Sequence, residues 1–288
     1  MGNCRFCGQK AGWFSDAHDA CVQKAEQGVA TLKRCVADAI VQGKKYEDVK
    51  DDIQSVKSAS AIPQDQFLAA FKEGWTQGVE TRCVAEPVGG IEFSQIGDFY
   101  RGVGITTDEM RSTHGFQTSV LSFLIWTVLN DEIEPYKGPI HFNLSAGEVP
   151  VFGIANVLVR EERTTRSYVG GYGGVSVRIA SGLYYRLGAT KGHREEGVSV
   201  QEVDYGDFLM TTEGIYFGGR EHGVNFKIPY KHIVRFNPYS DAVGICKDGA
   251  KEKILAPQHV PQSGWFLFNI LQSLAAKNSQ SQTHHRSS

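Results

Sequence analysis

Apolar positions in the first half of the chain recur at steps of three and four residues, which is the period of an amphipathic helix. One such repeat covers residues 22–40 and ends before Gly43. A second covers residues 49–56, and a third begins at Asp65, just after Pro63, and runs to residue 79. A further helical stretch surrounds residues 96–100. The first half is therefore predicted to be helical.

The last two helices of this region are predicted from a cap and from an apolar run. Thr106 or Thr107 is a candidate N-cap, because Asp108 and Glu109 follow and acidic residues favour the first turn of a helix. Residues 120–129 are almost wholly apolar, but the run is half of the roughly 20 residues that a membrane-spanning helix needs. The run is predicted to be a buried core helix.

The pattern changes near residue 140. Glycines become frequent, and β-branched or aromatic residues alternate with polar ones in short runs, which predicts strands of a small antiparallel barrel or sandwich. Those runs lie at residues 157–159, 168–169, 175–179, 184–187, 207–211, 214–217, 225–228, 233–236 and 242–246. A helical period returns after Gly264, with apolar residues that fit the open end of a barrel. Residues 278–288 contain no apolar side chain and are predicted to be disordered.

The charge is distributed unevenly along the chain, although the total is only −2. Residues 81–152 carry 4 basic and 9 acidic side chains, whereas residues 153–288 carry 16 basic and 12 acidic ones. This mild basic excess is ordinary solvated surface or, as an alternative, suits an anionic ligand. The near-neutral total gives no general attraction to nucleic acid, and no nucleic-acid partner is expected.

The first 21 residues contain the clearest chemical motif. Cys4 and Cys7 are separated by two residues, and His18 and Cys21 follow ten residues later with the same internal spacing. Two thiolates on a knuckle turn, and a His and a Cys one helical turn apart on a helix predicted to start near residue 15 or 16, can converge on tetrahedral zinc. Because all four ligands come from protein, a structural zinc site is predicted.

Two alternatives remain for the cysteines. Cys35 could replace His18 as the fourth ligand, although His18 is preferred, and a set of free cysteines in a flexible N-terminus is the alternative without a metal. The single positions of Cys35, Cys83 and Cys246 suit small buried side chains. Six scattered cysteines and no apolar signal stretch are typical of a reducing compartment, so we expect a cytoplasmic protein without a transmembrane segment.

The second half resembles a pleckstrin-homology-like domain of the bacterial type, related in plan to GRAM domains. The residues that carry the resemblance are the strand pair at 208–217, the Ile-Pro-Tyr-Lys-x-Ile-Val segment at 228–234, the Pro-Tyr-Ser-Asp turn at 238–241 and the closing Gly-Trp-Phe at 264–266. Residues 150–276 fit well and the first half fits loosely, as in uncharacterised bacterial proteins of this architecture. The resemblance implies a fold but no agreed activity. This chain lacks the loop of clustered lysines and arginines that phosphoinositide-binding members use between their first two strands, which argues against that ligand.

The predicted fold class is therefore α+β, a zinc knuckle and helical domain followed by an antiparallel barrel with a C-terminal capping helix. The predicted parts are a knuckle at 1–24, a helical domain at 25–140, the barrel at 141–277 and a tail at 278–288.

Residues 163–194 combine many glycines with scattered basic side chains, and are either a hairpin tip or an anion-binding loop. The candidate ligand-binding residues are Arg178, Arg186, Lys191, His193 and Arg194. No nucleophile elbow, dinucleotide fingerprint or phosphate loop is found in the sequence. The predicted function is a non-catalytic adaptor whose barrel docks a protein or peptide. The alternatives are a peripheral membrane protein that binds anionic lipid through the barrel, and an enzyme of unknown class.

Overall fold

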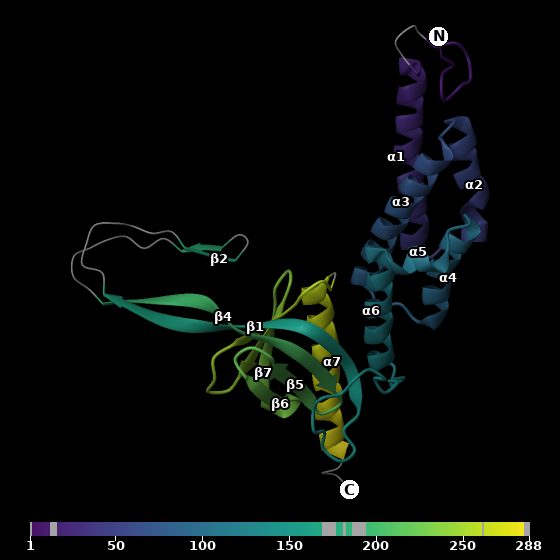
Figure 1. The fold of residues 1–288 in the computed structure, drawn as a ribbon. Helices are drawn as coiled ribbons and strands as arrows, with labels where there is room; N and C mark the ends of the chain where they lie inside the picture. Colours follow the sequence, from purple (N-terminus) through teal and green to yellow (C-terminus); the bar gives the residue numbers. More distant parts are fainter. Residues whose placement is uncertain are drawn as a thin grey trace. The chain divides into compact units, whose positions relative to one another are not determined.

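The computed structural model describes residues 2–11, 16–168, 177–180, 183–185, 194–260 and 262–284, and for residues within 162–199 and 281–284 it describes the backbone alone. The chain divides into two compact units, Met1–Asp131 and Glu132–Ser288. The described residues form a mixed α+β fold with seven α-helices and a seven-stranded antiparallel half-barrel (Figure 1). The change in sequence pattern near residue 140 lies slightly after this division.

The N-terminal unit contains the six predicted helices. They are α1 (Asp19–Val41), α2 (Tyr46–Ala59), α3 (Gln64–Ala85), α4 (Gly90–Gly102), α5 (Thr107–Arg111) and α6 (His114–Leu129). Thr106 caps α5, because its side chain accepts a hydrogen bond from the Glu109 N–H while the Glu109 carboxylate accepts one from the Thr106 N–H. The cap predicted at Thr106 or Thr107 is thus found at Thr106.

The core of this unit lies between α1 and α3. The predicted apolar faces supply its largest members, and the indole of Trp75 donates a hydrogen bond to the Ile96 carbonyl at 3.0 Å, so that its one polar group is satisfied. A Cβ atom added at Gly78 would lie 2.9 Å from Cα of Ala37 in α1, so glycine is needed for the close approach of the two helices. The fully buried side chains of this core include Leu32, Val36, Ile53, Phe71, Trp75 and Val79.

The C-terminal unit is a curled sheet with the strand order β6-β5-β4-β1-β9-β8-β7. Its strands are β1 (Pro150–Tyr168), β4 (Arg194–Thr211), β5 (Gly214–Gly219), β6 (Asn225–Pro229), β7 (Ile233–Pro238), β8 (Val243–Lys247) and β9 (Lys253–Pro257). Strand β1 pairs with both β4 and β9 and therefore joins the two halves of the sheet. The pairing of β1 with β4 continues to Tyr168 and Arg194, and makes the long ribbon seen in Figure 1. Strands β2 (Val177–Ala180) and β3 (Leu183–Tyr185) form a separate small sheet.

Helix α7 (Ser263–His284) packs against β7, β8, β9 and the 3-10 turn Tyr230–His232, as predicted for a C-terminal helix that covers the sheet. Phe266 is fully buried, and its ring meets that of Phe152 edge-on at 5.2 Å. The helix extends to residue 284, beyond the point at which disorder is predicted to begin. The physical reason is local, since the amide of Asn278 donates to the Thr212 carbonyl and Ser279 bonds back to Ala275.

Residues 132–149, which we call the strap, precede β1 and contact residues of β1, β4 and β5. The strap is joined to the sheet by backbone hydrogen bonds from Tyr136 to Pro150 and from Thr212 to Val149. The ring of Phe142 packs at 5.5 Å from that of Tyr216 in β5. The strap therefore belongs to the C-terminal unit, although it has no regular secondary structure.

Candidate metal centre

The first two candidate ligands lie on a short turn held by its own backbone. Asn3 and Lys10 form an isolated antiparallel bridge, and the Cys4 N–H donates to the Gln9 carbonyl at 2.6 Å. Gly8 has a φ of +73°, and its N–H returns to the Cys4 carbonyl at 2.8 Å. A residue with a Cβ atom would be strained in this conformation, so the glycine that follows the second cysteine makes the turn possible.

The second pair lies at the start of α1. His18 is the N-cap of the helix, with extended backbone angles, and its carbonyl accepts hydrogen bonds from the N–H groups of Cys21 and Val22. The prediction that this helix starts near residue 15 or 16 is therefore wrong by about one turn. The spacing still brings the two side chains together, because the first helical turn after His18 returns Cys21 to the same side.

All four predicted ligands meet. One ligand atom from each of Cys4, Cys7, His18 and Cys21 lies within 4.8 Å of the others, and we call this group the Cys/His cluster. Nδ1 of His18 lies 3.5 Å from the Cys7 sulfur and 3.8 Å from the Cys21 sulfur. Tetrahedral zinc bonds of about 2.3 Å place two sulfurs about 3.8 Å apart, so a small contraction of the cluster would fit zinc.

The histidine is oriented for this role. Its Nε2 atom lies 3.0 Å from the Lys10 carbonyl oxygen, which can only accept a hydrogen bond. The proton is therefore assigned to Nε2, which leaves the lone pair of Nδ1 directed at the sulfurs. A backbone carbonyl that fixes the tautomer of a ligating histidine is a common feature of metal sites.

The thiols differ in their readiness to ionise. Burial opposes ionisation of Cys4, but the backbone N–H groups of Cys7, His18 and Phe6 bring the pKa of its thiol down to about 6. Burial, together with hydrogen bonding and repulsion from the Cys7 and Cys4 sulfurs, raises the pKa of Cys21 to about 11. Without a metal, the protein thus favours the thiolate of Cys4 but opposes ionisation of Cys21 beside it. A bound dication would offset the repulsion between the thiolates.

Cys35, the alternative fourth ligand, is outside the cluster. It is half-buried in α1, Cys246 is half-buried in β8, and only Cys83 is fully buried among these three single cysteines. Burial raises the pKa of Cys83 to about 11, which suits the small buried role predicted for it. For Cys35 and Cys246 that prediction is met in part.

The predicted anion-binding residues are not brought together by anything that the structure describes. Arg186, Lys191 and His193 lie outside the described residues, and Arg178 in β2 and Arg194 at the start of β4 are described by their backbone alone. The proposal that this stretch binds a ligand stays a prediction.

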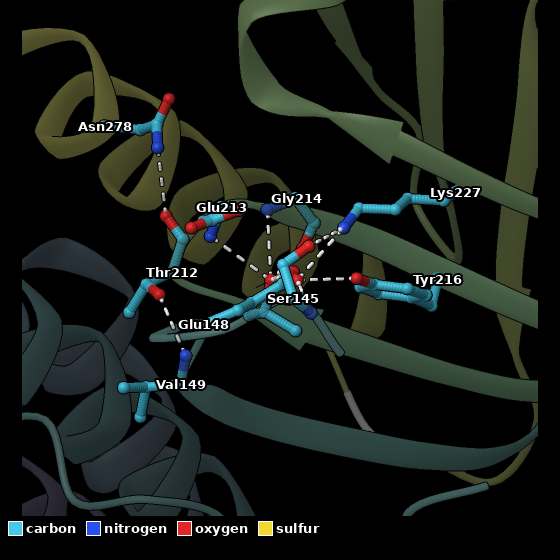
Figure 2. A network of polar contacts seen from close by, with 10 residues as sticks. Ser145, Glu148, Val149, Thr212, Glu213, Gly214, Tyr216, Lys227 and Asn278 are labelled. Carbon is cyan, nitrogen blue, oxygen red and sulfur yellow. Dashed lines mark hydrogen bonds and ion pairs between the residues drawn. The ribbon is translucent and has the colours of Figure 1, made fainter. Parts of the chain in front are cut away.

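Two buried carboxylates were not expected from the sequence. Glu148, at the end of the strap, accepts hydrogen bonds from the Thr211 hydroxyl at 2.5 Å, the Tyr216 hydroxyl at 2.6 Å and the Lys227 ammonium at 3.0 Å (Figure 2). The Ser145 N–H donates a fourth at 3.0 Å. Burial opposes ionisation, but these donors hold the pKa of Glu148 at about 2. We call these five residues the Glu148 network.

Asp204 is the second carboxylate, and it is 3% exposed. It accepts four backbone hydrogen bonds of 2.7–3.1 Å, one from Tyr205 and three from Glu221, His222 and Val224 in the turn between β5 and β6. Burial works against the charge, but the four donors lower the pKa of Asp204 to about 2. No local pattern marks either carboxylate, because three of the four donors to each are far away in the sequence.

No protein-family profile matches the chain, and no curated protein matches it at a significant level. Among the described residues, no helix combines the length and the apolar character needed to span a membrane.

Proposed function

We propose that this chain is a non-catalytic adaptor in which the Cys/His cluster holds a structural zinc ion and the half-barrel docks a protein or peptide partner. The observation that carries the proposal is the convergence of four protein ligands, with His18 held in the ligating tautomer. A catalytic zinc ion keeps one position for water, whereas four protein ligands fill the tetrahedron. Zinc is favoured over harder dications because three of the four ligands are thiols.

A stabilising role for the ion follows from the size of the core around it. Among the residues described there, the buried hydrophobic ones are Cys4, Ala11 and Ala17, with a few half-buried neighbours. These three small side chains bury little apolar surface, so a metal ion would add much to the stability of the knuckle. Metal binding supplies on the order of 10 kcal/mol in small zinc modules, which is enough to order the N-terminus against α1.

The docking role is supported by the plan of the C-terminal unit. A meander of four strands and a meander of three strands are joined through β1, and a C-terminal helix packs on the sheet. This order supports the resemblance to pleckstrin-homology-like domains, a fold class that mostly binds other molecules. The Glu148 network and Asp204 support a non-catalytic reading of the unit, since their hydrogen bonds are made within the protein and both carboxylates are strongly favoured as fixed anions.

The zinc part is tested by elemental analysis of protein purified with zinc in the medium. We expect one zinc ion per chain in the wild type and none in the Cys4→Ser/Cys7→Ser variant. Cys35→Ser is the matched control, because it removes a thiol from the same unit but outside the cluster. Wild-type protein without zinc would refute the site.

The docking part is tested by crosslinking the full chain in its native cell, and by co-sedimentation with neutral and anionic vesicles at low and near-physiological salt. A partner protein that is captured in stoichiometric amounts supports the adaptor. Salt-sensitive binding to anionic vesicles alone would replace it with the peripheral membrane alternative.

A further inference from the structure

The half-barrel has two edge strands, and they differ in what surrounds them. At one edge, the exposed face of β6 carries Lys227, whose ammonium bonds to Glu148 and to the Ser145 hydroxyl of the strap and lies 4.7 Å above the Tyr216 ring. At the other edge, β7 pairs with β8 and with no further strand among the described residues. In the described residues the strap makes no such contact at β7, and the element packed against this strand besides β8 is α7.

The β7 edge exposes an apolar side chain at a bulge. Val234 is 71% exposed, and the register of β7 against β8 shifts between Ile233 and Arg235. In the C-terminal unit, the large hydrophobic residues found exposed among those described are Ile140 and Val234. Val234 is by far the more exposed of the two, and lies on a strand edge, where backbone N–H and C=O groups are open to pairing.

The same edge is basic. The segment from residue 222 to 240 contains no acidic residue. In the part of the chain that the structure describes, no ion pair or side-chain hydrogen bond engages the exposed side chains of Lys231, Arg235 or Lys247. Lys247 lies opposite Ile233 in the register, so it belongs to the same surface. Asp248 follows Lys247 in the sequence and is an acidic neighbour of this surface. The carboxylate of Glu252 accepts hydrogen bonds from the side chains of Asn237 and Tyr239.

We propose that β7 is the docking edge of the half-barrel, and that an extended, acidic segment of a partner protein adds to the sheet beside it as an eighth strand. Main-chain hydrogen bonds to an open edge supply affinity, and the alternate side chains supply specificity. The basic side chains attract the acidic segment, and Val234 offers it one apolar contact. This inference rests on the proposed docking function and names the surface and the chemistry of the partner.

A membrane explains the edge less well. Lipid headgroups do not present a regular series of N–H and C=O groups for a strand to pair with, and one valine is a small apolar anchor. A strand edge protected only against aggregation is the other reading, since charges and bulges serve that purpose too. The two readings differ in whether an acidic strand binds.

The probe is a fluorescein-labelled 12-residue peptide of alternating glutamate with valine or threonine, titrated with the full chain at low salt and followed by anisotropy. We expect binding that weakens with salt, and a rise in Kd of about tenfold or more in Lys231→Glu/Arg235→Glu. Lys137→Glu is the matched control, because it reverses an exposed charge in the strap, and its Kd should equal that of the wild type. The same peptide N-methylated at alternate residues should lose binding.

A second measurement uses the wild-type chain, so its result does not depend on the folding of a variant. Hydrogen exchange of the wild-type chain should slow at residues 233–238 when the peptide is added, and not at residues 225–229. Absence of binding, equal binding of the N-methylated peptide or an unchanged Kd in the double variant would each overturn the inference. If the Lys231→Glu/Arg235→Glu variant loses binding to anionic vesicles but still binds the peptide, the surface belongs to a membrane and the inference is overturned. If a crosslinked partner is captured equally by the double variant, the adaptor proposal stands and the β7 assignment fails.

Discussion

The Cys/His cluster of the N-terminal unit and the Glu148 network of the C-terminal unit are both groups of polar side chains, but they are satisfied in different ways. Glu148 is a single negative charge that receives one ammonium group and three neutral donors from the protein. In the cluster, three sulfurs and one imidazole lone pair converge, and in the described part of the chain no lysine or arginine side chain is hydrogen-bonded to them.

This difference separates a candidate metal site from a structural anchor. A group of electron-pair donors without a protein cation can bind a cation from solution as its thiols ionise, so the Cys/His cluster is expected to respond to metal. A buried carboxylate with a full set of donors needs nothing further, so the Glu148 network is expected to respond to mutation and acid but not to metal.

The largest expected effect is that of metal removal. A strong zinc chelator should unfold the N-terminal knuckle up to the first turn of α1, because metal binding contributes on the order of 10 kcal/mol to such modules. The buried apolar side chains described there, Cys4, Ala11 and Ala17, are small. Hydrogen exchange should become fast over the knuckle while the strands of the C-terminal unit keep their protection.

His18→Cys is the control for this prediction. The variant keeps four zinc ligands of an accepted kind and should retain one zinc ion per chain. A chelated protein whose N-terminus keeps its slow exchange would show that the cluster is an ordinary group of free thiols, and would break the comparison with the Glu148 network.

The next effect is that of Glu148→Ala. Removal of the carboxylate leaves the buried Tyr216 hydroxyl without its acceptor. The Thr211 hydroxyl keeps the Gly214 carbonyl, and the partly exposed Lys227 ammonium keeps the Ser145 hydroxyl. The free energy of unfolding of the C-terminal unit should therefore fall by about 3 kcal/mol. Urea unfolding followed by circular dichroism measures the change.

Lys227→Met tests whether the loss arises from the pair or from Glu148 alone. In Glu148→Ala/Lys227→Met, the loss in free energy of unfolding should be clearly smaller than the sum of the losses in the two single variants, because neither charge is then left without its partner. Additive costs would mean that the ammonium contributes little and that the neutral donors hold the carboxylate.

Much of the helical unit could be predicted from the sequence, because its signals are local. The cap at Thr106 is set by a residue three positions away, and the ligands Cys4 and Cys7 share one turn. The apolar run at residues 120–129 also lies in a helix, α6, which packs against α3 and buries Leu121, Ile125 and Val128. Period and spacing carry such information without knowledge of the fold.

The Glu148 network could not be predicted, because three of its four donors are distant from Glu148 in sequence. Thr211, Tyr216 and Lys227 are 63 to 79 residues from Glu148, and only the pairing of β4, β5 and β6 brings them together. Asp204 likewise reaches a turn 17 to 20 residues away. A lone glutamate in an irregular segment looks like a solvated charge until the sheet is known.

Acid should weaken the C-terminal unit through both carboxylates. The pKa of Glu148 falls from its ordinary 4.5 to about 2 on folding, and that of Asp204 falls from 3.8 to about 2. Because the folded values are the lower ones, both contributions are complete above pH 4.5 and are lost as the pH falls towards 2. Unfolding curves between pH 6 and pH 2 should show this loss for the wild type, and a shallower one for Glu148→Ala. Equal slopes would assign the acid sensitivity to other groups.

The smallest effect is expected for Asp204→Asn. The amide keeps the shape of the side chain and one accepting oxygen, but it loses the charge and the second acceptor that the Glu221, His222 and Val224 N–H groups need together. We expect a loss of about 2 kcal/mol in the free energy of unfolding, with faster hydrogen exchange confined to residues 220–224. The acid sensitivity that remains in this variant should be that of Glu148. Because this turn is built from protein donors alone, added zinc should not restore it, and restoration by zinc would contradict the distinction between the two kinds of cluster.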